Sequence, residues 1–303
     1  MRLPCVGDNR LATSNPPLNN PGDLSVGGTP AAATNPWSRR LMRTLKFVVV
    51  IYLAVVLLMW LFENSLVYHP SPLKSDVVLP AGFENAEFTS ADGTELHGWY
   101  LPNPDPQAVV LFCHGNGGNI SHRVSQAIVL NRLGASVLLF DYRGYGRSAG
   151  SPNEAGILDD SRAAREWLAT KAGIPEDQIV LLGESLGSGV AVDLAMDGAR
   201  GVILQNAFAS LPDAASAHFP WIPVKWLMRN RYDSLAKIKN YHGPLLQSHG
   251  NHDRIVPFAS GQKLFAAANE PKQFVTIAGG DHNDMPSKQW YDAIGQFFAR
   301  LEP

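Results

Sequence analysis

Short runs of consecutive apolar residues, separated by stretches with a helical pattern, constrain the fold of this chain more than any other feature. A run that is apolar at successive positions is typical of a strand covered on both faces. Strands that alternate with helices indicate a parallel, doubly wound sheet, so we expect an α/β fold. The predicted strands are AVVLFC, SVLLFDY, IVLLG, GVILQ, PLLQSHG and FVTIAGG, after a hairpin of ENAEFTS and TELHGWYL around Asp92-Gly93; the predicted helices cover about 119–133, 155–171, 186–197, 257–269 and 286–300.

The residues directly after each predicted strand are the first candidates for chemistry. In an open sheet of this kind the active crevice lies beyond the carboxyl ends of the strands. The segments found there are HGNGGN, DYRGYGRS, ESLG, NHDRIVP and DHND. A serine (Ser185), an acid (Asp253) and a histidine (His282) therefore follow one another in chain order, each just past a strand.

Ser185 stands in GESLG, with Gly183 two residues before it and Gly187 two residues after it. A tight strand-to-helix turn that needs small residues for packing would explain the glycines. A nucleophile elbow, in which such a turn exposes a serine oxygen, explains the serine as well. A serine hydroxyl needs a base to take its proton, so His282 is the candidate base and Asp253 would hold its tautomer.

Together these motifs resemble the α/β-hydrolase superfamily, whose triad runs Ser, Asp or Glu, His along the chain. HGNGGN, DYRGYGRSAG, GESLG, HGNHDRIVP and GGDHND more narrowly resemble the membrane-anchored α/β-hydrolase-domain serine hydrolases, over about residues 65–300. The resemblance implies an acyl-enzyme formed at Ser185, with Asp253 and His282 as its partners. It also implies an oxyanion hole made by the backbone N–H groups of Leu186 and Asn116, with Gly117 as the alternative to Asn116.

Other polar residues compete for these roles. His249 and His252 lie near Asp253 in the sequence, but they precede the acid, whereas the family order places the base last. His114 is expected to fix the oxyanion turn through hydrogen bonds. Asp141, in DYRGYGRS, is expected to belong to a structural turn that anchors loops beside the site.

Residues 207–242 depart from the rhythm of strands and helices. They hold the aromatic residues Phe208, Phe219, Trp221 and Trp226, together with two prolines. In the family this region forms a small cap over the substrate, so an apolar cap suggests a hydrophobic, lipid-like acyl substrate. The alternative is that the aromatic residues only fill the core, and the sequence leaves both open.

The front of the chain predicts a membrane anchor. From Phe47 to Phe62 there is no charged residue, Pro or Gly. With Leu45 and Lys46 the stretch is about 18 residues, or roughly 27 Å as a helix, which is long enough to span a bilayer. We expect a disordered basic tail over 1–43, a single-pass transmembrane anchor over 44–63, and a hydrolase domain over 64–303 with the small cap at about 207–242.

The charges around the anchor predict its orientation. The cations before the apolar stretch place the N-terminus in the cytoplasm and the catalytic domain on the far side, which would be periplasmic, extracellular or lumenal. These cations are Arg39, Arg40, Arg43 and Lys46. A cleaved signal peptide is the main alternative, and a true start at Met42 is another.

Composition narrows the classes of function. A formal net charge of −2 gives no reason to expect nucleic acid as a partner. Cys5 and Cys113 make neither a disulfide framework nor the spacing of a zinc site, and we expect no metal or organic cofactor. The prediction is a serine hydrolase of carboxylic esters or thioesters. A serine peptidase and a non-catalytic scaffold on the hydrolase fold are the alternatives, and the oligomeric state stays open.

Overall fold

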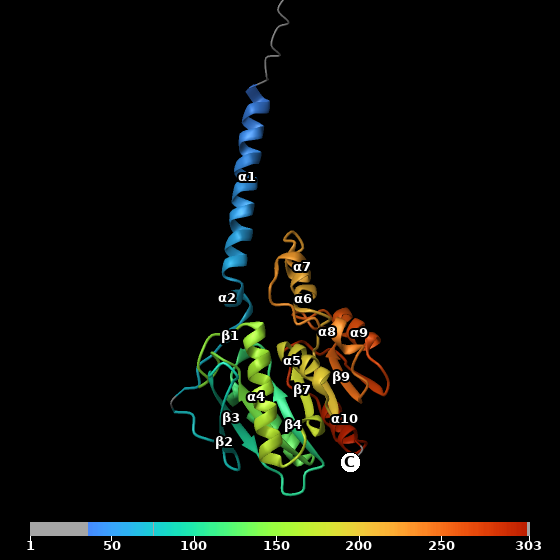
Figure 1. Cartoon of the computed structure of the whole chain (residues 1–303). Coiled ribbons are helices and arrows are strands. Elements are labelled where there is room, and N and C mark those ends of the chain that lie inside the picture. The colour runs from blue at the N-terminus through green and yellow to red at the C-terminus, as the bar shows by residue number, and fades with distance from the viewer. Residues whose placement is uncertain (1–35, 75, 302–303) are drawn as a thin grey trace, which may run out of the picture. The chain divides into compact units, whose positions relative to one another are not determined.

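The computed structural model describes residues 36–74 and 76–301 (Figure 1). The chain falls into two compact units, Met1–Ile51 and Tyr52–Pro303. Most of the predicted basic tail, residues 1–35, lies outside the described residues, so its predicted disorder stays a prediction. Of the first unit, the structure describes only residues 36–51, which are helical.

Helix α1 runs from Pro36 to Leu61 and includes most of the predicted anchor. It begins well before residue 44, where the sequence placed the start of the anchor. The intervening Arg, Leu and Met residues favour a helix, so the basic segment continues the helix instead of ending it. The part from Trp37 to Leu61 is long and apolar enough to cross a membrane. The short helix α2 follows at Glu63–Val67.

An eight-stranded sheet forms the centre of the second unit, in the order β10-β9-β8-β7-β4-β6-β3-β2. Strands β10 to β6 run parallel, and the hairpin β2-β3 joins the edge in antiparallel fashion. This is the mostly parallel sheet that the sequence predicts. The strands are β2 (Glu84–Thr89), β3 (Glu95–Leu101), β4 (Ala108–Cys113), β6 (Ala135–Asp141), β7 (Val180–Glu184), β8 (Gly201–Gln205), β9 (Leu245–Gly250) and β10 (Lys272–Ile277).

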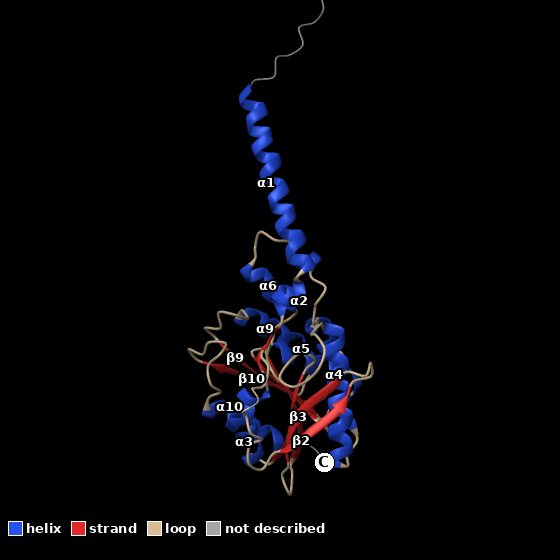
Figure 2. Cartoon of the chain, turned by 90° about the vertical axis from the view of Figure 1, so that its left-hand side faces the viewer, coloured by secondary structure: helices blue, strands red, loops and turns tan. Residues whose placement is uncertain are grey.

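Helices cover both faces of the sheet, which explains the unbroken apolar runs. In β4, Val109 and Leu111 join one buried core, while Val110 and Phe112 join the other. The first core packs against α4 (Glu154–Ala172), α5 (Leu186–Leu194), α8 (Ser234–Ile238) and α9 (Phe258–Ala267). The second core packs against α3 (Val124–Arg132) and α10 (Lys288–Phe298). Figure 2 shows α4 on one side of the sheet and α3 with α10 on the other.

The segment between β8 and β9 carries two helices that the other crossovers lack, α6 (Leu211–His218) and α7 (Val224–Leu227). Ser210 begins α6 by accepting a hydrogen bond from the N–H of Asp213, as an N-cap residue does. In Figure 1, α2, α6 and α7 lie at the same end of the sheet, and Figure 2 shows α2 and α6 there as well. These helices fall within the range 207–242 that the sequence assigns to a cap.

The Pro-rich stretch after α2 is bound to the domain rather than forming a free linker. Strand β1 (His69–Pro70) pairs in parallel with β5 (Gly117–Gly118). The N–H of Ser71 donates to the carbonyl of Gly118 at 3.2 Å, and Leu73 donates to Gly146 at 3.0 Å. Glu63, which the sequence assigned to the anchor, is also buried in this domain. The chain therefore becomes buried in the domain at Glu63 and contacts the HGNGGN turn soon afterwards.

Candidate active site

Ser185 occupies a strained turn between β7 and α5. Its backbone φ is +51°, in the left-handed region that residues other than glycine rarely adopt. A Cβ atom on Gly183 would lie 2.4 Å from the carbonyl oxygen of Gly187, and one on Gly187 would lie 2.0 Å from that of Cys113. Both glycines are therefore required for the close approach of strand and helix, and the turn carries the Ser185 side chain at the strand end.

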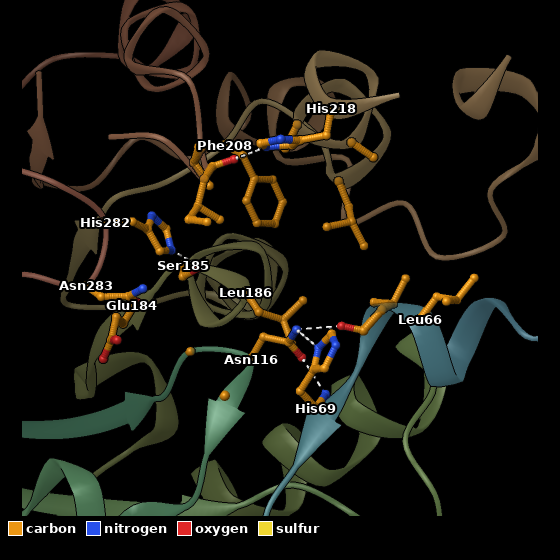
Figure 3. A pocket seen from close by; sticks show the side chains of 18 of the residues that line it. Leu66, His69, Asn116, Glu184, Ser185, Leu186, Phe208, His218, His282 and Asn283 are labelled. Atoms are coloured by element: carbon orange, nitrogen blue, oxygen red, sulfur yellow. Dashed lines mark hydrogen bonds between the residues drawn. The ribbon is translucent and has the colours of Figure 1, made fainter. Parts of the chain in front are cut away.

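His282 lies between Ser185 and Asp253, at hydrogen-bond distance from each of them. His282 Nε2 is 2.8 Å from Ser185 Oγ, and His282 Nδ1 is 2.7 Å from Asp253 Oδ2. Figure 3 shows the His282 ring beside Ser185, with a dashed line for the contact between them. These distances suit transfer of a proton from the hydroxyl to the ring. The structure thus brings the three predicted residues together, and their catalytic roles stay a prediction.

Asp253 is held as a carboxylate by the groups around it. Its side chain is fully buried, and Oδ1 accepts the N–H groups of Ile255 and Val256 at 2.8 Å. Burial alone would raise the pKa of Asp253. Hydrogen bonds from His249, His282 and Val256 lower it by more than burial raises it, so the pKa lies well below its ordinary value. The carboxyl group therefore stays ionised at neutral pH and can stabilise a protonated His282.

The two competing histidines have other surroundings. His249 is fully buried on β9, with Nε2 at 3.2 Å from Asp253 Oδ2 and 3.0 Å from the carbonyl oxygen of Val256. It contacts the acid rather than Ser185. His252 is exposed in the following turn and is not among the residues that line the pocket.

The second side of the site is the HGNGGN turn after β4. The Asn116 carboxamide donates to the carbonyl of Val67 and lies 3.1 Å from His69 Nδ1, and its oxygen accepts from the Tyr145 hydroxyl at 2.9 Å. Figure 3 shows Asn116 between Leu186 and His69. The N–H of Leu186 opens α5 and has no acceptor within that helix. The side chain of Asn116 thus fixes the turn whose backbone the sequence assigned to the oxyanion hole.

Comparison with known proteins identifies the family. A family model described as the alpha/beta hydrolase fold matches residues 108–233. The uncharacterised protein Rv2307c of Mycobacterium tuberculosis is 39% identical over 267 residues, which are 85% of this chain and 95% of that protein. The alpha/beta hydrolase domain-containing protein WAV2 of Arabidopsis thaliana is 32% identical over 263 residues, which are 77% of this chain and 85% of WAV2. This chain belongs to the α/β-hydrolase fold family.

A solved structure has the same fold. The Pyrococcus furiosus esterase Pf2001 is similar with a TM-score of 0.62 and 21% identity, over 78% of this chain and 100% of Pf2001. The predicted family and the predicted α/β-hydrolase fold are therefore confirmed. Membership of the family supports a hydrolase activity for this chain.

Two buried polar residues behind the turn support it, as the sequence predicts. His114 Nδ1 contacts the carbonyl oxygen of Gly115 at 2.7 Å, and burial lowers the pKa of His114 to about 3, so its ring is neutral. Asp141 Oδ1 accepts the N–H of Ile120 at 3.0 Å, and burial raises the pKa of Asp141 to about 7. This α/β-hydrolase therefore keeps both ends of the HGNGGN turn in fixed positions.

Asn206 is a further residue of the site, and the sequence analysis missed it. Its Nδ2 donates to the carbonyl of His282 at 2.9 Å, and its Oδ1 accepts the N–H of Gly250 at 3.2 Å. Like Ser185, it has a positive φ, +50°. It follows β8 directly, so inspection of every strand end could have found it. Asn206 ties the loop of the candidate base to strand β9.

A pocket of about 1000 Å³ opens above Ser185. One wall consists of the strand-end residues, including Glu184, whose carboxylate pairs with Arg123 at 2.7 Å. The opposite wall is largely apolar and comes from the end of α1, α2, α6 and α7; it includes Val56, Met59, Trp60, Leu66, Phe219, Ile222 and Leu227.

The four aromatic residues of the 207–242 segment separate into two groups. Phe208 and Phe219 line the pocket, and Phe208 is also part of the buried core. Trp221 and Trp226 are exposed and do not line the pocket. The phenylalanines thus contribute to the pocket, and Phe208 to the core as well. The two tryptophans belong to neither the pocket nor the core.

No group of His, Cys, Asp or Glu side chains suited to hold a metal ion occurs among residues 36–74 and 76–301. Cys113 is a free, buried thiol within β4.

Proposed function

We propose that this chain is a serine hydrolase that cleaves carboxylic esters or thioesters through an acyl-enzyme at Ser185. The observation that carries the proposal is the continuous chain of contacts from Ser185 Oγ to His282 and on to Asp253, with 2.8 and 2.7 Å between the paired atoms. Ser185 itself stands on a strained turn, and the space beside Gly183 and Gly187 admits no side chain.

In the first half of the reaction, Ser185 Oγ attacks the carbonyl carbon while His282 Nε2 takes the hydroxyl proton. The ionised Asp253 stabilises the imidazolium that forms. The tetrahedral intermediate then loses the alcohol or thiol, which receives the proton from His282, and Ser185 carries the acyl group. In the second half a water molecule gives a proton to His282 and attacks the acyl carbon. The bond from the acyl carbon to Ser185 Oγ then breaks, Ser185 Oγ takes the proton back from His282, and the acid is released.

The negative charge on the intermediate's oxygen needs two donors. The N–H of Leu186 is one, because it opens α5 beside Ser185 and has no helical acceptor. The N–H of Asn116 is the other, and Gly117 the alternative, because the turn lies against the same pocket. Donors fixed before the reaction stabilise the developing charge without reorganisation.

The pocket favours a hydrophobic acyl group. Its outer wall consists mainly of aliphatic and aromatic side chains, and a volume of about 1000 Å³ is at the upper end of the range for ligand pockets. The esterase Pf2001 shares the fold, which supports ester hydrolysis.

We propose further that α1 anchors the enzyme as a single-pass helix with a cytoplasmic N-terminus and the catalytic domain on the far side. The apolar stretch Phe47–Leu61 within α1 and the cations Arg39, Arg40, Arg43 and Lys46 just before it support this orientation. If α1 were a cleaved signal peptide, Tyr52–Leu61 would be absent from the mature pocket wall. Mass determination of the membrane-bound protein distinguishes the two.

The test is covalent labelling of the full-length protein in detergent with a fluorophosphonate, beside Ser185→Ala. Labelling and ester turnover should both disappear in Ser185→Ala, with turnover reduced on the order of 10⁴-fold or more. Circular dichroism of the variant checks that it is folded. A folded wild type that neither labels nor hydrolyses esters would contradict the proposal and favour a non-catalytic scaffold.

A further inference from the structure

One face of the last turns of α1 lies against the cap segment. Tyr52, Val56, Met59 and Glu63 recur at the spacing of a helical face. Val56 and Met59 are half-buried and line the pocket, whereas their neighbours on the helix are exposed. The Tyr52 hydroxyl donates to the carbonyl of Trp221 at 2.9 Å. The segment Phe219–Trp226, called the cap tip below, therefore reaches back along the helix as far as Tyr52.

The far end of this face is polar. The Glu63 carboxylate accepts the N–H groups of Arg229 and Asn230 at 2.8–3.0 Å and pairs with the Arg229 guanidinium at 3.1 Å. The same guanidinium stacks on the Trp60 ring at 4.9 Å. This cluster of charge marks where the apolar part of the helix ends.

The length of the apolar stretch fixes the depth of the cap tip. The uncharged residues between Lys46 and Glu63 are fewer than the roughly 20 that cross a hydrocarbon core. All of Tyr52–Leu61 must therefore lie in the bilayer if α1 spans it. Tyr52 is roughly 14 Å along the helix from Leu61, so the Trp221 carbonyl lies well below the membrane surface.

The cap tip has the composition that such a position requires. Trp221 and Trp226 are 74% and 88% exposed, although both are large and apolar. Exposed apolar patches of this kind mark contact with a membrane or a partner. Lys225 is the only charged residue of the tip; its ammonium pairs with Asp213 at 2.6 Å, and its long stem can reach toward water.

Part of the backbone of the cap tip is paired within the tip, which favours a place in lipid, where an unpaired polar group is costly. The N–H groups of Ile222, Val224 and Trp226 donate to carbonyl oxygens within the tip, and its two prolines have no N–H to satisfy. The Tyr52 hydroxyl supplies a donor to the Trp221 carbonyl. This contact accounts for a tyrosine in an otherwise apolar stretch of helix.

We propose that the cap tip inserts into the bilayer beside α1, and that the pocket receives a membrane-resident acyl ester between these two elements. The proposal rests on the proposed hydrolase function. Val56 and Met59 on one side, and Phe219 and Ile222 on the other, line the same pocket as Ser185. An acyl chain bound there passes from lipid to Ser185 without crossing water.

The first test compares two esters with full-length protein in dioleoyl phosphatidylcholine vesicles. The substrates are 4-nitrophenyl palmitate, dissolved in the bilayer, and water-soluble 4-nitrophenyl acetate. In the double variant Trp221→Asp and Trp226→Asp, kcat/KM for palmitate should fall at least about tenfold, because carboxylates oppose insertion. Acetate hydrolysis should stay near that of the wild type. Val78→Asp, at an exposed apolar residue outside the pocket, is the matched control and should change neither.

The second test measures insertion without hydrolysis. Trp226→Cys, in a Cys5→Ser background, is labelled with a nitrobenzoxadiazole fluorophore, while Cys113 is buried. Spin-labelled phosphatidylcholine should quench the label at position 226, whereas a water-soluble nickel chelate should not. The opposite pattern is expected for Val78→Cys.

The outcomes distinguish the two parts of the proposal, which are insertion of the cap tip into the bilayer and entry of the substrate from lipid. Quenching at position 226 by the chelate alone would overturn insertion. Quenching by lipid, with equal losses on palmitate and acetate in the double variant, would overturn the lipid route and leave insertion standing. If the wild type cleaves neither ester, the hydrolase function and the lipid route both fall, and the label still decides insertion.

Discussion

The two walls of the pocket are built on different physical principles. In the strand-end wall, the candidate triad and the turn beside it are held by hydrogen bonds, from the 2.7 Å contact of His282 with Asp253 to the bonds that hold Asn116. In the wall made by α1, α6 and α7, the lining side chains are mainly apolar, and few of them make directional contacts, such as that of the Trp60 ring with Arg229. The first wall depends on distances within a few tenths of an ångström, and the second on how much apolar surface it offers. A single substitution in the strand-end wall should therefore cause a large loss of activity, whereas one in the apolar wall should cause a small loss that depends on the area removed.

The largest effect is expected for Asp253→Asn. The amide cannot stabilise a protonated His282 and favours the wrong tautomer of the ring, so kcat should fall about 10⁴-fold with the fold retained. Steady-state kinetics on a soluble ester measures the change. A loss below tenfold would show that Asp253 is not the orienting acid.

His249→Leu is the graded counterpart, because it removes a side chain that contacts Asp253 but not the nucleophile. Losing one hydrogen bond to a buried carboxylate costs about 1–3 kcal/mol, so kcat should fall roughly five- to 150-fold. A loss as large as that of Asp253→Asn would instead mean that His249 acts directly.

The next effect is expected for Asn116→Ala. The substitution keeps the backbone N–H of the turn but removes the bonds to Val67, His69 and Tyr145. A displaced oxyanion donor typically costs on the order of 10²-fold in kcat, so kcat should fall with little change in KM. Tyr145→Phe removes one of these bonds and should lose only a few-fold. Equal losses in both variants would contradict the role of the carboxamide.

Much of the strand-end wall could be predicted from the sequence because its chemistry admits few residue types at fixed places. Ser185, Asp253 and His282 each follow an apolar run, and parallel strands bring such positions to one edge of the sheet. Asn206 could have been found as a strand-end residue, but its partners, like those of the Asn116 side chain, could not be predicted. Both depend on which loop each amide reaches, and sequence separation says nothing of that distance.

The apolar wall was harder to predict because an apolar residue fits a core, a pocket or a lipid surface equally well. The sequence analysis weighed only pocket and core for Trp221 and Trp226, and the structure exposes both. Glu63 looked like the end of the anchor. Its partners Arg229 and Asn230 are 166 and 167 residues away, so no local sequence pattern predicts these contacts.

Glu63→Gln tests the contact of Glu63, after the end of α1, with Arg229 and Asn230, which follow α7. Burial alone would raise the pKa of Glu63, but hydrogen bonds from Asn230 and Arg229 lower it below the ordinary value. A lowered pKa means that the stabilisation is present above the ordinary carboxyl range and is lost as pH falls through the folded pKa. Glu63→Gln should therefore destabilise the domain by about 1–3 kcal/mol at pH 7.

Thermal unfolding in detergent at several pH values measures this difference. It should begin to shrink below about pH 4, where the unfolded state takes up the proton, and should be lost as pH falls through the lower pKa of the folded state. Glu87→Gln, at an exposed carboxylate on β2, is the control and should leave the melting temperature unchanged. A pH-independent difference would show that shape, rather than charge, matters at position 63.

The smallest effect is expected for Met59→Ala, which removes apolar surface from the pocket wall. Met59 lines the pocket, while Leu58 next to it is exposed and does not. The lost contacts are worth about 1–2 kcal/mol to an acyl chain long enough to reach them, so kcat/KM for long-chain esters should fall roughly five- to thirtyfold. An acetyl group is too short to reach Met59, so acetate hydrolysis should be unaffected, and Leu58→Ala should change neither. Equal losses on every chain length would mean that Met59 supports the strand-end wall, and that the two walls are not independent.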